Sequence, residues 1–136
     1  MGCDIHLFVE VKKDGIWTHV PGEFYDGRNY DLFGILADVR NRNELTPISD
    51  RIGWPNDVSG CAKYANDMGY HSHSHLTVAE LIAFDWTRTA EVEYLGIPPE
   101  VVSYYSLCKV WWSETMPRLL ALGAPEDVRI VFCFDC

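Results

Sequence analysis

The chain has 136 residues, of which 48% are hydrophobic, and its net charge at neutral pH is −9. A chain of this size can bury a core of its own, and its hydrophobic content, without any low-complexity tract, argues against disorder. Its 11 lysines and arginines are spread along the sequence, whereas a protein that grips nucleic acid gathers such residues to neutralise phosphates. We therefore expect one domain over residues 1–136 that does not bind nucleic acid directly.

The first twenty residues predict a β-hairpin. Every second position over residues 5–11 is aliphatic, and Asp14 and Gly15 supply a turn. Because successive side chains of a strand point to opposite faces, Asp4 and His6 should lie together on the face opposite the aliphatic row.

A helix is predicted over residues 30–41, where apolar residues recur at helical spacing behind Asn29, a residue type that caps helices. Residues 41–60 contain several residues that break regular structure and predict an irregular connection. A connection of that length inside a compact domain is more often functional than idle. Residues 56–68 predict a further short helix.

The segment "GYHSHSHL", residues 69–76, predicts an extended chain because polar and apolar residues alternate. Thr77 and Glu80 then match the capping box that begins a helix. Two prolines in "GIPPEVVSYYSLCKVWW", residues 96–112, predict the start of another helix.

A last short helix is predicted between Pro117 and Gly123, and residues 125–136 read as a strongly hydrophobic strand. Both ends of the chain are thus β and the middle is helical. The simplest arrangement places the C-terminal strand beside the N-terminal hairpin and packs the helices on this small antiparallel sheet. We predict an α+β fold.

The sequence predicts a cytoplasmic protein. No apolar run reaches the roughly 18 residues of a membrane-spanning helix, and the N-terminus lacks the basic and apolar segments of a signal peptide. The five cysteines lack the spacing of a disulfide framework, which is typical of a reducing compartment. Cys133 and Cys136 form a C-x-x-C pair, but residues three apart on a strand point to opposite faces, so we interpret them as a core and a chain-end cysteine.

Three alternating histidines suggest a metal site. In an extended segment His71, His73 and His75 share one face, and two neighbours can converge on one ion, whereas the outer two are about 13 Å apart. The nearest match for the missing ligands is Asp4 and His6, another pair two positions apart. The alternative is that the histidines hydrogen-bond a carbonyl, cap the next helix or face solvent.

Mixed imidazole and carboxylate ligands favour a divalent transition metal, with zinc first and Mn, Fe or Ni next, over Ca or Mg. An ion with an open coordination position lowers the pKa of bound water to about 7 and supplies a nucleophile. Such a site would support a metal-dependent hydrolase.

A second candidate cluster lies in "DGRNYD", residues 26–31. Arg28 can fork onto a carboxylate or phosphate, and Asn29 and Tyr30 can orient a ligand at the start of a helix. The alternative is structural: Asn29 caps the helix, Tyr30 packs, and Arg28 pairs with an acidic neighbour.

The segments "MGCDIH", "RNYDLF", "RIGWPNDVS", "HSHSHLT" and "DVRIVFCFD" together resemble a family of small uncharacterised proteins of tailed bacteriophages and prophages. In that family an aromatic residue follows His-Ser-His-Ser, so His75 departs from the pattern, which makes His71 and His73 the preferred ligand pair. The resemblance implies a phage accessory protein acting in the host cytoplasm.

Two hypotheses follow. In the first, the protein binds a divalent metal through Asp4, His6, His71 and His73, and acts as a hydrolase on an unknown small molecule. In the second, it is a non-catalytic acidic phage factor that binds and inhibits a basic host defence protein. The second hypothesis uses the acidic surface and exposed aromatic residues, with Trp54, Trp111 and Trp112 as candidates.

Overall fold

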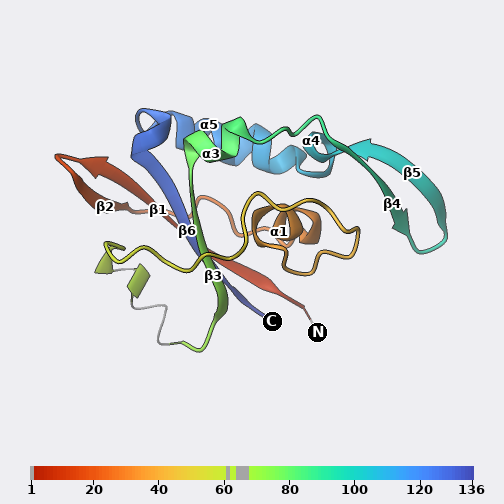
Figure 1. Cartoon of the computed structure of the whole chain (residues 1–136), viewed down its shortest axis with the longest axis horizontal. Helices are drawn as coiled ribbons and strands as arrows, with labels where there is room; N and C mark the ends of the chain where they lie inside the picture. The colour runs from red at the N-terminus through yellow and green to blue at the C-terminus, as the bar shows by residue number, and fades with distance from the viewer. Residues whose placement is uncertain (1, 61, 64–67) are drawn as a thin grey trace.

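The computed structural model describes residues 2–60, 62–63 and 68–136 (Figure 1). A four-stranded antiparallel sheet has the order β2-β1-β6-β3. Its strands are β1 (Asp4–Lys13), β2 (Ile16–Val20), β3 (His71–Thr77) and β6 (Val128–Asp135). The predicted hairpin and the C-terminal strand beside it are therefore confirmed. Asp14 and Gly15 both have positive φ, as a two-residue hairpin turn of type I′ requires.

The strand β6 is covered on both faces, which explains its continuous hydrophobic run. All of its residues except Asp135 are buried. Val128, Ile130, Phe132 and Phe134 belong to the main core, on what we call the inner face. On the opposite, outer face Val131 packs in a smaller cluster with Phe8 and Trp54.

Short helices cover the inner face (Figure 1). They are α1 (Tyr30–Ala37), α3 (Val78–Ala83), α4 (Tyr104–Leu107), the π-helix η1 (Trp111–Thr115), α5 (Met116–Leu120) and the 3-10 turn η2 (Pro125–Asp127). The two predicted caps are confirmed. The backbone N–H of Leu32 donates to Asn29 Oδ1 at 3.1 Å, and Thr77 and Glu80 form the capping box. The α+β fold class is also confirmed.

The helix predicted to begin at the paired prolines is wrong. Residues Thr89–Tyr94 (β4) and Ile97–Ser103 (β5) form a separate antiparallel hairpin that extends from one end of the molecule (Figure 1). A residue that precedes proline disfavours the helical region, and both Ile97 and Pro98 do so. Each strand of this two-stranded sheet is an edge, where proline's missing N–H is tolerated. The helix α4 begins only after Ser103, whose side chain caps it.

Two of the five cysteines form a disulfide, Cys3 with Cys136, across the paired ends of β1 and β6. The cysteine spacing did not predict this bond, because spacing along the chain does not reveal that Cys3 and Cys136 meet at the ends of the two neighbouring strands. Cys133 is free and buried, so the C-x-x-C residues do point apart as predicted. No helix in residues 2–60, 62–63 and 68–136 is long and apolar enough to span a bilayer. The helix predicted over residues 56–68 falls partly outside the described residues.

Candidate functional site

A β-bulge in β3 separates the alternating histidines. His71 pairs with Phe134 and Ser74 with Phe132, so three steps along β3 match two along β6. Ser72 has a φ of 56° within the bulge. The period of two is therefore broken, and His71 leaves the face that His73 and His75 share. The prediction that all three histidines share one face is wrong for this reason.

The four predicted metal ligands do not gather around one point. Asp4 accepts hydrogen bonds from Arg28 Nη2 at 2.8 Å and Nε at 3.0 Å, so its carboxylate is already engaged. His6 lies on β1 and His73 on β3, about 10 Å apart because β6 runs between them. His71 is exposed, and its Nδ1 contacts Ser72 Oγ at 2.8 Å. Across the described part of the chain, no three His, Cys, Asp or Glu residues form a group that could hold a metal.

The outer face instead aligns His6, Cys133 and His73 in one row across three strands. His6 pairs with Cys133 in the register of β1 and β6, and the bulge places Ser72 and His73 opposite Cys133. His6 Nε2 and His73 Nε2 are both buried without a hydrogen-bond partner among the described residues. Such an unpaired polar atom costs about 1–3 kcal/mol.

Aromatic rings hold the two imidazoles of this row. His6 stacks on Tyr70, with ring centroids 4.1 Å apart, and its Nε2 lies 3.8 Å from Asp135 Oδ2. His73 packs edge-on against Trp54, 4.8 Å between centroids. Burial, and then the neighbouring His71, lower the pKa of His73. The neutral imidazole, which is the form that binds metals, is thereby favoured.

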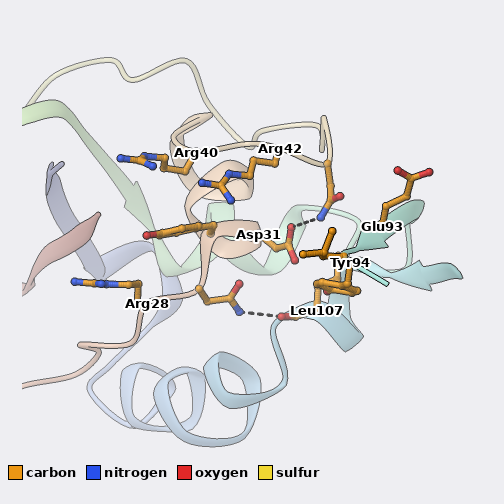
Figure 2. A pocket seen from close by; sticks show the side chains of 11 residues that line it. Arg28, Asp31, Arg40, Arg42, Glu93, Tyr94 and Leu107 are labelled. Carbon is orange, nitrogen blue, oxygen red and sulfur yellow. Dashed lines mark hydrogen bonds between the residues drawn. The ribbon is translucent and has the colours of Figure 1, made fainter. Parts of the chain in front are cut away.

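The second predicted cluster lines a cavity of about 500 Å³ (Figure 2). Its wall consists of residues 28–31 at the start of α1, residues 40, 42 and 43 in the following loop, residues 93–95 at the tip of the β4-β5 hairpin, and residue 107 in α4. All three residues predicted to bind a ligand, Arg28, Asn29 and Tyr30, lie in this wall.

The structural roles considered for these three residues are also observed. Asn29 caps α1 and its Nδ2 donates to the carbonyl of Leu107 at 2.8 Å. The Tyr30 hydroxyl accepts from the backbone N–H of Cys3 at 3.0 Å. Arg28 pairs with Asp4. The two interpretations are compatible, since these contacts hold the residues in place while they line the cavity.

Sequence reasoning missed Arg40 and Arg42, which lie over the ring of Tyr30 with their guanidinium carbons 5.7 Å and 5.5 Å from its centroid. Within the described residues neither arginine has a carboxylate within 4.0 Å. Figure 2 shows them with Arg28 at one end of the cavity and Glu93 and Tyr94 at the other. The available signal was the sequence "RNRN", residues 40–43, which places two arginines around the end of the predicted helix.

Asn41 anchors the loop that carries both arginines. Its Nδ2 donates to Asp38 Oδ1 at 2.9 Å and to the carbonyl of Leu45 at 2.7 Å, and its Oδ1 accepts from the Leu45 N–H at 2.8 Å. Asp38, Arg40 and Glu44 have φ values of 56°, 51° and 54°. This left-handed conformation costs a non-glycine residue about 1–2 kcal/mol, and such strain concentrates at functional sites.

The tryptophans predicted to be exposed for a protein partner are largely covered. Trp111 is 1% exposed, and Trp54 Nε1 donates to the carbonyl of Phe132 at 2.9 Å. Trp112 packs against Trp86, 5.3 Å between centroids. Exposed apolar side chains occur instead on the β4-β5 hairpin, at Tyr94, Leu95, Ile97 and Val101.

No family model, curated protein or solved structure matches this chain. The resemblance to small tailed-phage proteins therefore stays a prediction from the motifs.

Proposed function

We propose that this protein binds a small anionic organic molecule in the cavity beside α1, with Arg28, Arg40 and Arg42 as the anion-binding groups. The observation that supports this is the pair Arg40 and Arg42, which line the cavity without a carboxylate partner in the described chain. The whole sequence holds 20 acidic residues against 11 lysines and arginines. Despite this excess of acidic residues, the guanidinium groups of Arg40 and Arg42 lie over the ring of Tyr30 and stay open to an anionic ligand.

The chemistry of the wall fits a carboxylate or phosphate attached to an apolar body. A guanidinium presents a planar fork of donors that matches either anion. Asp4 engages only Nε and Nη2 of Arg28, so Nη1 keeps its donors. Tyr94, Leu95 and Leu107 supply apolar surface to the same cavity. Its volume lies within the range of about 300–1,000 Å³ found for small-molecule sites.

Isothermal titration calorimetry with phenyl phosphate and benzoate tests this proposal. We expect saturable binding of at least one probe by the wild type. Arg40→Gln and Arg42→Gln should each weaken it at least tenfold, because a hydrogen bond to a charged group contributes about 1.5–3 kcal/mol. Lys13→Gln changes the net charge equally on the exposed end of β1 and should bind like the wild type. Equal losses in all three variants would indicate a diffuse charge effect and contradict the proposal.

A second candidate function is transition-metal binding on the outer face, favoured by His6 Nε2 and His73 Nε2, which are buried and have no hydrogen-bond partner in the described part of the chain. Each imidazole would offer one nitrogen and water would complete the coordination, because no third His, Cys, Asp or Glu of the described residues joins them in a metal-binding group. Asp4 is engaged by Arg28, and the bulge moves His71 away. Imidazole nitrogens suit zinc best, ahead of Mn, Fe and Ni. With an open coordination position, this ion could activate a bound water as the nucleophile of a hydrolase.

Elemental analysis of untagged protein and a Co²⁺ titration test the second candidate. A site on His6 and His73 should give one metal per chain and a ligand-field absorption band of bound Co²⁺. His6→Ala and His73→Ala should lose both signals, whereas His71→Ala should keep them. Metal-free protein whose spectrum does not change on adding Co²⁺ would exclude this candidate.

A further inference from the structure

The cavity beside α1 has an acidic end as well as a basic one. Asp31 and Glu93 line it together with the three arginines. Figure 2 shows Asp31 between the arginines and the hairpin residues Glu93 and Tyr94. Positive and negative side chains thus occupy different parts of one wall.

These opposite charges do not neutralise each other. Within the described residues, no oxygen of Asp31 or Glu93 lies within 4.0 Å of an arginine nitrogen. Asp31 Oδ1 accepts a hydrogen bond from Asn43 Nδ2 at 2.8 Å, which leaves Oδ2 available. The cavity therefore offers donors at one end and acceptors at the other.

A purely anionic ligand is attracted electrostatically by the arginines but is repelled by Asp31 and Glu93. A ligand that also carries a cationic group is attracted at both ends, because each of its charged groups then lies beside side chains of opposite charge. A neighbouring cavity of about 320 Å³ shares Arg42, Asn43 and Glu93 with this one and adds Glu44 and Glu91.

We infer that the ligand is a zwitterion of amino-acid type, with its carboxylate at the arginines, its ammonium group at Asp31 and Glu93, and an apolar side chain against Tyr94, Leu95 and Leu107. This inference rests on the proposed anion-binding function and adds the cationic group. The amide of Asn43 holds Asp31 and so orients the acceptor toward the ligand.

Calorimetry with three matched probes tests the inference. L-phenylalanine carries both charges, 3-phenylpropanoate lacks the ammonium group, and 2-phenylethylamine lacks the carboxylate. We expect the wild type to bind phenylalanine at least tenfold more tightly than either analogue. Asp31→Asn should remove the preference for phenylalanine over 3-phenylpropanoate, and Arg42→Gln should weaken both carboxylates.

Two further variants separate a ligand contact from a structural effect. Asp31 lies in the first turn of α1, so circular dichroism must show that Asp31→Asn is folded. Glu93→Gln, at an exposed position on β4, should reduce the same preference without touching the helix. Glu126→Gln makes the same charge change in η2, away from the cavity, and should leave the preference intact.

The outcomes distinguish failure of the zwitterion inference from failure of the proposed anion binding. If 3-phenylpropanoate or phenyl phosphate binds and phenylalanine binds no more tightly than 3-phenylpropanoate, the ammonium site is excluded while anion binding stands. If phenyl phosphate, benzoate and all three phenyl probes fail to bind, both ideas are overturned. A preference for phenylalanine that survives Asp31→Asn and Glu93→Gln would also overturn the inference.

Discussion

Gly34 leaves open the space that the side chain of Asn41 occupies. A Cβ built on Gly34 would lie 2.6 Å from Asn41 Oδ1, closer than any ordinary contact. The missing side chain in α1 thus lets Asn41 dock on the helix and hold the loop that presents Arg40 and Arg42. The positions of Arg40 and Arg42 in the cavity wall therefore depend on Gly34, which lies earlier in the chain, within α1.

Gly34→Ala should therefore lower both stability and affinity. Alanine improves helix propensity by about 1 kcal/mol, but it displaces Asn41, whose three hydrogen bonds contribute about 0.5–1.5 kcal/mol each. We expect a net loss of about 1–2 kcal/mol in urea denaturation, with weaker binding of phenyl phosphate. Gly60→Ala is the matched control, because no atom of the described residues lies within 4 Å of a Cβ there. Gly34→Ala with unchanged affinity would show that Asn41 does not position the arginines.

Arg40→Gly should separate stability from function. Arg40 has a φ of 51°, a conformation that glycine adopts without strain. Relief of that strain is offset by the added freedom of glycine in the unfolded chain, so stability should stay equal or rise by up to about 1 kcal/mol. Affinity for phenyl phosphate should nevertheless fall at least tenfold.

Arg51→Gly provides the comparison for this prediction. Arg51 has a φ of 46°, so the same backbone relief applies, but it lies outside the cavity wall. Thermal denaturation of Arg51→Gly should resemble that of Arg40→Gly, with wild-type affinity in calorimetry. Loss of affinity in both variants would mean that loop flexibility, rather than the guanidinium of Arg40, controls binding.

Local patterns in the sequence were sufficient for the sheet and the caps. Alternation over residues 5–11 identified the buried face of β1, and Thr77 with Glu80 identified the start of α3, because both signals depend only on near neighbours. The same local logic failed at β5. The paired prolines suggested the start of a helix there, while the restriction on residues before Pro98 and Pro99 favoured an extended chain.

The candidate site could be predicted only in part. Arg28, Asn29 and Tyr30 were identified because they are contiguous and lie at the start of a predicted helix. Arg40 and Arg42 were not, since their placement depends on a left-handed loop whose conformation no residue pattern specifies. The packing of the β4-β5 hairpin against the cavity likewise depends on tertiary structure. So does the bulge at Ser72, which moves His71 from its expected face.

The buried pair Glu10 and Arg129 should be strongly coupled. Arg129 Nε donates to Glu10 Oε1 at 2.7 Å, and the side chains are 5% and 0% exposed for arginine and glutamate. The backbone N–H of Ser59 donates to Glu10 Oε2 at 2.7 Å, and the Arg129 guanidinium lies 4.1 Å from the centroid of Trp17. Arg129→Met leaves an uncompensated buried charge, which costs about 3–5 kcal/mol.

A double-mutant cycle in urea measures this coupling. Adding Glu10→Leu to Arg129→Met removes the orphaned carboxylate, so the double variant should be more stable than Arg129→Met alone. Lys12→Met, on the same strand but exposed, should change stability by less than about 0.5 kcal/mol. Strictly additive effects would show that the two side chains do not stabilise each other.

The buried thiols should be inert in the folded protein. Burial raises the pKa of Cys108 and of Cys133 to about 12, with smaller contributions from Asp31 and Asp135. The thiolate is the reactive form, and a thiol with that pKa is ionised in only about one molecule in 10,000 at pH 8. A thiol reagent such as DTNB should therefore react with neither residue in the native state.

Counting thiols tests this burial together with the disulfide. Cys61 lies outside the described residues, so Cys61→Ser provides the background. Native protein should show no fast-reacting thiol, guanidinium-unfolded protein should show two, and unfolded protein treated with a reductant should show four. Four thiols without a reductant would contradict the disulfide between Cys3 and Cys136. Fast labelling of Cys133 in the native state would mean that the outer face opens, which would bring its sulfur within reach of a metal in solution.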